Sequence, residues 1–164
     1  MADDELLEPP RVAGLFTAAA AGELMSSHVS VEVAAGLGIL GDRYATRKGH
    51  WSDPQWKDQQ LTLVSAELAA ELGLPPDGLR RNIVTRGIDL DILVGLEFGI
   101  GTARFIGRRI CAPCGYIGRV NNRPGLFREL AGRGGIRVSV EVGGVVSVGD
   151  EIRILGAADE VFDE

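Results

Sequence analysis

The sequence predicts a mostly β, barrel-like domain of about eight short strands with two or more short helices. Short apolar runs recur along the chain and are separated by glycine-containing turns, which is the pattern of all-β domains. No regular alternation of strands and helices runs along the chain, so a Rossmann-type domain is not expected. The 164 residues suit one domain, and because only 5% are aromatic, Val, Ile, Leu and Ala must fill its core.

The first half of the chain supplies four of the expected strands. They are expected at residues 11–20, 27–34, 60–65 and 80–87. In the second of these, Val29, Val31 and Val33 alternate with polar residues, which is typical of a half-buried strand. Ser65 is expected to cap a short helix that Gly73 ends, since serine is a favoured N-cap and glycine a favoured residue after the last turn.

The second half contains the strongest local signal, a pair of apolar runs around Gly143 and Gly144. This pattern predicts a β-hairpin over residues 136–148. Further strands are expected at residues 101–107 and 149–155, and a second short helix at residues 124–132. In the last strand we expect Ile152 and Ile154 to point inward, because they occupy alternate positions.

The charge distribution limits the classes of partner. The net charge of −6 argues against a nucleic-acid-binding surface, because phosphate contacts need clustered Lys and Arg. Residues 104–137 nevertheless hold eight arginines and one acidic residue, Glu129, so we expect this region to meet a small anion. The acidic N-terminus does not resemble a signal peptide, and no apolar run approaches the roughly 18 residues of a membrane span. We therefore expect a cytoplasmic protein with no nucleic-acid or membrane partner.

Both cysteines, Cys111 and Cys114, lie in one C-x-x-C stretch, with Arg108 and Arg109 before it and Arg119 after it. Nearby guanidinium groups lower the pKa of a cysteine because they favour the thiolate. The thiolate is the form that acts as a nucleophile or binds a metal. The sequence therefore predicts an activated cysteine in this stretch.

Three other interpretations of the two cysteines remain open. They could be small buried residues at the end of a strand. They could be zinc ligands, but His28 and His50 would have to complete the site, and their spacing matches no zinc pattern. They could form a thioredoxin-like redox pair, but such pairs lie in a βαβ setting that this sequence lacks.

Two further motifs could bind an anion. In a strand, Arg80 and Asn82 would share one face and Arg81 the other, so Arg80 and Asn82 are the pair expected to line a cleft. The alternative is a solvated edge strand. The glycine-rich segment GRGGIR brings Arg133 and Arg137 near backbone N–H groups that can approach an anion. Together with an activated cysteine, these residues predict a site that binds phosphate and carries a reactive sulfur. The residues alone do not predict which reaction takes place there.

Several segments of the chain resemble the MOSC domain in order and spacing. They are GLGILGDRYA, QQLTLVSAE, RRNIVTRGIDL, GTARFIGRRICAPC, and AGRGGIRVSV with GGVVSVGDEI. This module is found at the C-terminus of molybdenum-cofactor sulfurases and in stand-alone bacterial proteins. The resemblance covers about residues 25–155. Residues 1–24 would then form an N-terminal segment with the first strand, and residues 156–164 an acidic tail.

The resemblance implies a barrel-like MOSC fold that binds the molybdenum cofactor. Cys114 corresponds to the family's hallmark cysteine, which ligates molybdenum in amidoxime-reducing relatives. The family's Arg-x-Asn motif, which contacts the pterin, falls on Arg80 and Asn82. The further cofactor-binding residues that we expect are Thr85, Arg133, Gly134, Gly135 and Arg137.

The sequence also departs from the family pattern. Tyr44 stands where many relatives have histidine, and we expect Tyr44 or His50 to donate a proton. Cys111 is an extra thiol, so either cysteine could act, although Cys114 fits better. The sequence shows no cysteine-desulfurase domain with its pyridoxal-phosphate lysine. Pyridoxal phosphate, which is associated with the family through that domain, is therefore not expected to bind here.

Three functions are compatible with these features. The first is a molybdenum-dependent reductase that acts on a small N-hydroxylated substrate and receives electrons from another protein. The second is a sulfur carrier, in which Cys114 takes persulfide sulfur from a separate cysteine desulfurase and delivers it to a cofactor or metal centre. The third is a non-catalytic module that binds a small anion.

Overall fold

A computed structural model describes residues 8–20, 22–46, 60–111, 119, 121–123, 125–130 and 132–158. The N-terminal strands are β1 (Arg11–Thr17), β2 (Ser26–His28), β3 (Ser30–Ala34), β4 (Gly38–Ile39), β5 (Leu61–Ser65) and β6 (Ile83–Arg86). The others are β7 (Leu96–Ile100), β8 (Ala103–Ile110), β9 (Ile136–Val142), β10 (Gly144–Ser147) and β11 (Ile152–Ala157). The helices are α2 (Ala66–Glu71), α4 (Leu126–Glu129) and a 3-10 helix, η2 (Leu90–Leu93). Within these residues no helix is long and apolar enough to cross a bilayer.

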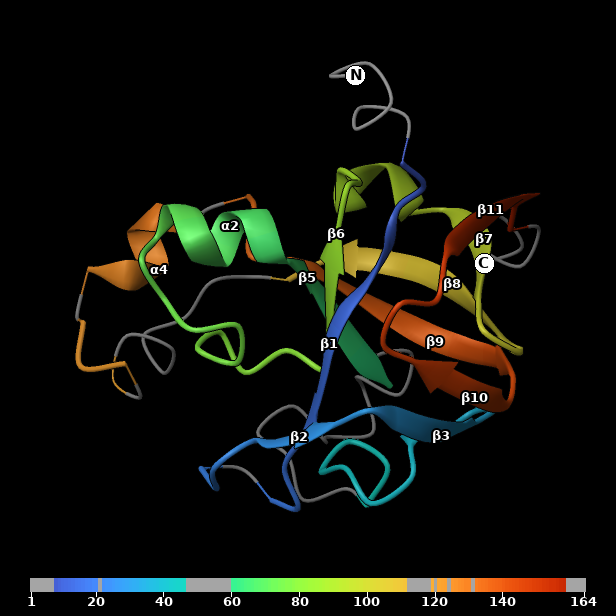
Figure 1. The fold of residues 1–164 in the computed structure, drawn as a ribbon, viewed down its shortest axis with the longest axis horizontal. Coiled ribbons are helices and arrows are strands. Elements are labelled where there is room, and N and C mark those ends of the chain that lie inside the picture. The colour runs from blue at the N-terminus through green and yellow to red at the C-terminus, as the bar shows by residue number, and fades with distance from the viewer. Residues whose placement is uncertain are drawn as a thin grey trace.

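Eight strands form one curled sheet in the order β11-β7-β8-β9-β5-β6-β1-β2, and β10-β3-β4 form a second sheet (Figure 1). The strand pairs of both sheets are antiparallel except β5 with β6. The large sheet curls until the start of β1 meets the chain before β11. Arg11 forms a β-bridge with Glu151 there, and the carbonyl of Pro10 accepts from the N–H of Ile152. The mostly β, barrel-like prediction is therefore confirmed.

The main hydrophobic core lies inside the curl. Leu61 and Leu63 of β5 pack there with Ile136 and Val138 of β9, and all four are fully buried. The second sheet contributes further core residues, which are Val31, Val33, Ile39 and Val146. Most of these side chains are aliphatic, as the composition predicts. Because each fully buried aliphatic side chain stabilises the fold by about 2 kcal/mol, this core holds the curled sheet together.

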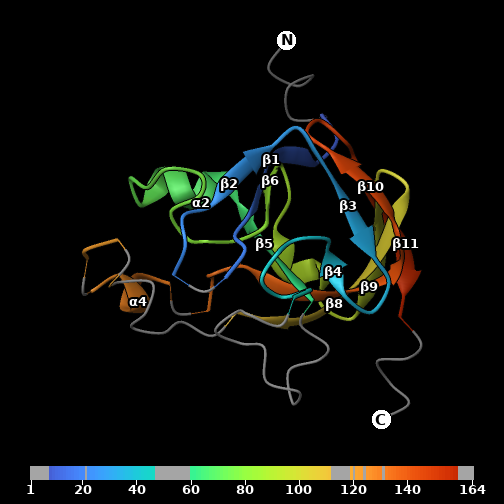
Figure 2. The ribbon, with the colours of Figure 1, turned by 90° about the horizontal axis from the view of Figure 1, so that it is seen from below.

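A second apolar cluster covers one part of the sheet's outer face. Val64 of β5 and Val84 of β6 point outward and pack with Leu68 of α2 and with Leu126 and Leu130 at α4. Figures 1 and 2 both show α2 and α4 together on one side of the sheet, away from β10 and β11. The outer face beyond these helices carries the polar residues described below.

The hairpin predicted around Gly143 and Gly144 is wrong. β9 pairs with β8 and β5, whereas β10 pairs with β3 in the other sheet. Neither glycine has the positive φ that a two-residue hairpin turn requires. A Cβ at Gly144 would instead overlap Thr102, whose hydroxyl accepts from the N–H of Val145 at 2.8 Å. The glycine is thus needed for close backbone approach, a requirement that has no local sequence signature.

Other strand predictions also need correction. Residues 27–34 form two strands, and Val29 between them is 82% exposed instead of facing inward. Ile152 is buried as expected, but Ile154, which pairs with Phe98 of β7, is 50% exposed. The strand expected over residues 80–87 begins only at Ile83. The alternating face assumed for Arg80 and Asn82 therefore does not apply.

Gly107 on β8 offers a test of how tightly the sheet is packed. A Cβ at this position would overlap the carbonyl oxygen of Leu93, so Gly107→Ala is expected to lower the free energy of unfolding by about 3 kcal/mol. Gly125 is the matched control, because its φ of −85° suits any residue and a Cβ there would meet nothing. Gly125→Ala should change stability by less than about 0.5 kcal/mol. Urea unfolding of both variants measures the difference, and equal midpoints would contradict it.

Candidate functional site

The outer face of the sheet carries buried polar residues beyond the helices. Thr62 on β5 and Arg137 on β9 are opposite each other in the antiparallel ladder, and their neighbours in both strands point into the core. Because side chains alternate along a strand, Thr62 and Arg137 must lie on the outer face. They are only 1% and 3% exposed. This part of the outer face is therefore a covered polar surface.

Asn82 ties this polar surface to the neighbouring strands. Its Oδ1 accepts from the backbone N–H of Thr62 at 3.0 Å and from the Thr62 hydroxyl at 3.2 Å. Its Nδ2 donates to the carbonyl of Phe16 at 3.1 Å. Asn82 is fully buried, and its amide group is engaged by these protein groups. The hydrogen bonds fix the segment that carries Arg80 and Arg81 against β1 and β5.

The turn after β4 packs over the polar surface through Arg43 and Tyr44. Arg137 donates through Nη1 to the Tyr44 hydroxyl oxygen at 3.4 Å, and the guanidinium of Arg43 lies 4.7 Å from the centroid of the Tyr44 ring. Arg43 also donates through Nη2 to the carbonyl of Arg80 at 2.8 Å. Because Tyr44 accepts from Arg137, its own hydroxyl hydrogen remains available for another acceptor.

Four arginines of this region, Arg43, Arg80, Arg81 and Arg137, are each more than nine-tenths buried, and we call them the buried arginine cluster. Among the described residues Asp42 is the one buried carboxylate, and it forms an ion pair with Arg43. Taking a charge out of water costs several kcal/mol unless an opposite charge compensates. The cluster is therefore suited to an anion, which guanidinium groups bind through paired N–H donors.

Arg80 and Arg81 differ from the strand-based expectation. Arg80 has a left-handed φ of 57° and precedes β6, so residues 80–82 do not alternate as in a strand. Arg81, which alternation would place on the opposite face, is also buried and donates through Nε to the carbonyl of Gly134 at 3.0 Å. Both arginines, and not Arg80 alone, belong to the buried cluster.

The backbone conformation of Arg80 can be separated from the role of its side chain. A left-handed φ costs a non-glycine residue about 1 kcal/mol, and glycine avoids this cost. Both Arg80→Gly and Arg80→Ala remove the guanidinium, so their difference isolates the backbone. We expect Arg80→Gly to be the more stable variant by about 1 kcal/mol in urea unfolding. Greater stability of the alanine variant would contradict a left-handed residue at this position.

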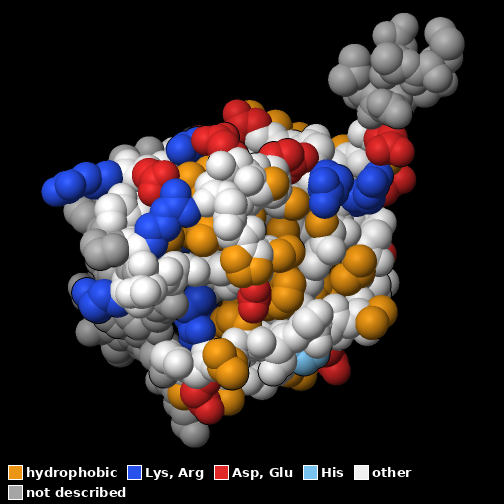
Figure 3. Space-filling model, turned by 60° about the vertical axis from the view of Figure 1, so that its left-hand side comes forward, with side chains coloured by type: hydrophobic (Ala, Val, Ile, Leu, Met, Phe, Trp, Pro, Cys, Tyr) orange, Lys and Arg blue, Asp and Glu red, His pale blue; other side chains and the backbone are white. Residues whose placement is uncertain are grey.

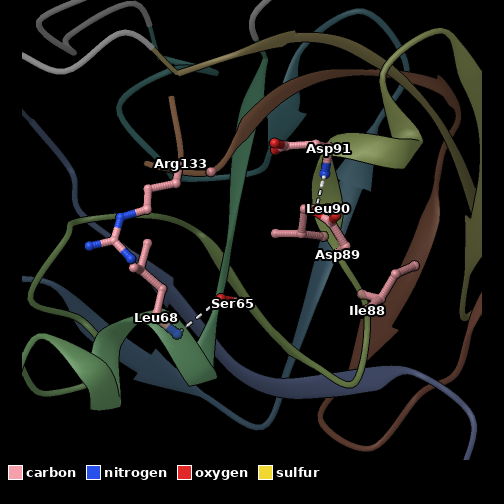
Figure 4. A pocket seen from close by; sticks show the side chains of 8 residues that line it. Ser65, Leu68, Ile88, Asp89, Leu90, Asp91 and Arg133 are labelled. Carbon is pink, nitrogen blue, oxygen red and sulfur yellow. Dashed lines mark hydrogen bonds between the residues drawn. The ribbon is translucent and has the colours of Figure 1, made fainter. Parts of the chain in front are cut away.

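The glycine-rich turn divides the expected cofactor residues between two places. Arg133 forms an ion pair with Glu71 of α2, and its side chain is 42% exposed. With Gly135 it lines a small pocket of about 130 Å³, which Asp89 and Asp91 line as well (Figure 4). Two carboxylates line this pocket, and its one guanidinium is already paired with Glu71, so it is less suitable for an anion than the buried arginine cluster.

Gly134 and Cys111 connect this turn with the cysteine segment. The N–H of Cys111 donates to the carbonyl of Gly135 at 2.8 Å, and its free thiol is fully buried. A Cβ at Gly134 would lie 3.6 Å from Nη2 of Arg81 and 3.7 Å from the carbonyl oxygen of Cys111. The start of the cysteine segment is therefore next to a buried guanidinium. Because a reactive thiol must be accessible, the Cys111 thiol suits a structural role.

The remaining site predictions concern Thr85, His50 and Cys114. Thr85 is buried in β6, where its hydroxyl donates to the carbonyl of Val64 at 3.5 Å. His50 and Cys114 lie outside the described residues. In the described part of the chain, no three His, Cys, Asp or Glu side chains are grouped so that they could hold a metal ion.

Sequence reasoning missed Arg43, Thr62 and Arg81 as members of this site. Thr62 could have been found, because it is the polar residue at an outward position of an otherwise apolar strand. Arg81 was assigned to the wrong face because a strand was expected there. Arg43 follows a glycine-rich turn, and no local pattern indicates that such a residue is buried.

A shallow groove lies beside α2, away from the buried arginine cluster. Its lining residues are Ala66, Glu67, Ala69, Ala70, Leu74, Pro76 and Arg86, and its volume is about 480 Å³. Figure 3 shows hydrophobic side chains gathered at the centre of one face, with Lys and Arg side chains towards its borders. The groove contains one acidic and one basic side chain, and it lacks the convergent donors of the arginine cluster.

Comparisons with known proteins agree with this architecture. The chain is similar to the YuaD protein of Bacillus subtilis, with 24% identity, a TM-score of 0.75, and coverage of 92% of this chain and 98% of that one. It is also similar to YiiM from Escherichia coli, with 19% identity, a TM-score of 0.64, and coverage of 90% and 71%. At these identities the likeness shows the fold alone.

No curated protein matches the sequence. The family model of the MOSC domain matches residues 55–153, which is more than half of the chain. The chain therefore belongs to the MOSC domain family.

Proposed function

We propose that this protein binds the molybdenum cofactor at the buried arginine cluster and reduces N-hydroxylated compounds. The observation that carries the proposal is the grouping of four arginines that are each more than nine-tenths buried, with Asp42 as the one buried carboxylate among the described residues. Such a concentration of guanidinium groups favours a ligand with more than one negative charge. The cofactor has that character, because its pterin bears a phosphate group.

The donors of the cluster fit a phosphate. Guanidinium groups present paired N–H donors at the spacing of phosphate oxygens, and Arg137 and Arg80 would hold the group from two elements of the fold. Thr62 and Asn82 bond each other, so their contribution is to position the segment that carries Arg80. We assign Asn82 this positioning role in place of the direct contact that the resemblance implies.

Tyr44 is the proton donor in this proposal. Its oxygen accepts from Arg137 and its ring contacts the guanidinium of Arg43, so the side chain has a fixed orientation. The phenol hydrogen is left to supply one of the two protons with which a substrate oxygen leaves as water, and solvent would supply the other. Replacement by phenylalanine would keep the ring over Arg43 but remove the hydroxyl, and with it both this hydrogen and the oxygen that accepts from Arg137.

Cys114 is the proposed metal ligand. When bound, the cofactor supplies a molybdenum centre that accepts an oxygen atom from the substrate and is re-reduced by an electron-donor protein. Cys114 follows Cys111 by three positions in the sequence. Cys111 is adjacent to Gly134 and Arg81.

The test is the molybdenum and pterin content of protein purified from cells that make the cofactor. We expect about one molybdenum and one pterin per chain for the wild type and a large loss for Arg137→Gln. Arg104→Gln is the matched control, because Arg104 is 56% exposed and pairs with Glu97 on the surface. An absence of both molybdenum and pterin from the wild type would overturn the proposal. A persulfide on Cys114 in the same metal-free preparation would favour the sulfur carrier instead.

A further inference from the structure

We infer that Arg81 forms an oxyanion-binding subsite of its own, beside the turn that carries Gly134. The resemblance and the strand pattern both point to Arg80, so Arg81 is a new assignment. The subsite rests on the proposed function only for the identity of its ligand and not for its existence.

The hydrogen bonding of Arg81 leaves most of its donors available. Nε donates to the carbonyl of Gly134 at 3.0 Å, and within the described part of the chain this is the one hydrogen bond of the side chain. A guanidinium has five N–H donors, so the four on Nη1 and Nη2 remain for a ligand. The Nε bond also fixes the orientation of the fork.

Arg81 is a largely buried cation. The residue is only 5% exposed, and taking a charge out of water is costly unless an opposite charge compensates. The carboxylates on nearby elements have other partners. Glu71 pairs with Arg133, and Glu129 pairs with Arg123. A buried cation with free donors and no carboxylate partner among the described residues indicates a site for an external anion.

Gly134 lies beside this guanidinium. A Cβ there would be in ordinary contact with Nη2 of Arg81, the carbonyl of Cys111 and the side chain of Leu130, at 3.6 to 3.8 Å. The Nη2 edge of the guanidinium therefore faces the turn that carries Gly134.

The geometry of the fork defines the chemical class of the ligand. Nη1 and Nη2 present parallel N–H groups, which bind two oxygens of one carboxylate or phosphate group. In the context of the proposed function, two sources have this chemistry. The oxyanion is either the phosphate of the cofactor or an acidic group on the substrate.

The experiment is a titration of the full-length protein with inorganic phosphate, followed through the Nε–Hε resonances of its arginines in ¹⁵N NMR. We expect the Arg81 resonance to shift in a saturable manner, and Arg81→Gln to weaken phosphate binding at least about tenfold. Arg133→Gln, in which an exposed arginine of the adjacent turn is changed, should bind as the wild type does. Because the resonance is followed in the wild type, the test does not depend on the variant folding.

The outcomes separate the possible sources. In protein loaded with cofactor, an Arg81 resonance that no longer responds to phosphate identifies the cofactor's own phosphate as the ligand, and one that still responds identifies the substrate. An Arg81 resonance that stays fixed in cofactor-free protein while other arginines shift would overturn the subsite. Phosphate binding at Arg81 in a protein that never acquires molybdenum would support the subsite and count against the proposed function.

Discussion

Replacement of Cys114 with serine is expected to abolish reduction of N-hydroxylated compounds. Serine keeps the size of the side chain but replaces a sulfur ligand by a hydroxyl, which is a poor ligand for a metal that prefers thiolate. The measurements are the rate of amidoxime or 6-hydroxylaminopurine reduction and the molybdenum content of the same sample. We expect the rate to fall to background, because the reaction would need this ligand in every turnover.

Cys111→Ser is the matched control for this substitution. The Cys111 thiol is fully buried and its backbone N–H is held by Gly135, so the change is expected to affect stability more than chemistry. Far-UV circular dichroism and a thermal melt establish that both variants fold. An active Cys114→Ser together with an inactive Cys111→Ser would show that the other thiol acts. The sulfur-carrier alternative also requires Cys114, but it would show a persulfide on the wild-type thiol in place of bound molybdenum.

The fold could be predicted at the level of class because local patterns decide it. The strand expected at residues 60–65, the cap at Ser65 and the turn at Gly73 depend on local signals, and all three occur, with the strand over Leu61–Ser65. The partners of β9 and β10 could not be predicted in the same way. Gly143 and Gly144 resemble a hairpin turn locally, yet close approach to Thr102 and to β3 determines the path of the chain. Such contacts join residues about 40 or more positions apart.

The residues of the candidate site could likewise be predicted only in part. The sequence identified Arg80, Asn82, Arg137 and Tyr44 as candidates, and hydrogen bonds place these residues around one polar surface. The pairing of Arg133 with Glu71 could not be foreseen, because the two residues are 62 positions apart and belong to different elements. Sequence spacing therefore located the segments of the site, and tertiary packing determined which side chains face it.

Asp42 is the second residue whose replacement should have a large effect. Its Oδ1 accepts from the N–H of Ala18 at 3.0 Å and from Nη1 of Arg43 at 3.1 Å, and its Oδ2 accepts from the N–H of Tyr44 at 3.2 Å. Both oxygens thus face donors. In Asp42→Asn the amide NH₂ must oppose a donor in either orientation, and one buried donor loses its acceptor.

The same substitution removes the one carboxylate that offsets the buried arginine cluster among the described residues. The four guanidinium groups would then have no buried carboxylate near them among the described residues. Breaking a buried ion pair from one side costs about 3–5 kcal/mol, so we expect Asp42→Asn to lower Tm by about 10 °C. Asp91→Asn is the control, because it makes the same chemical change at a residue that is exposed on the surface.

The charge argument also predicts how an added anion should act on the Asp42 variant. Phosphate that binds the folded state raises Tm by mass action, and the more positive cluster of Asp42→Asn should bind it more tightly. The increase in Tm with phosphate should therefore be larger for Asp42→Asn than for the wild type. For Asp91→Asn the increase should equal that of the wild type. Loss of the increase in the Asp42 variant would mean that Asp42 organises the anion site through its hydrogen bonds, and that the net charge of the cluster is not what attracts the ligand.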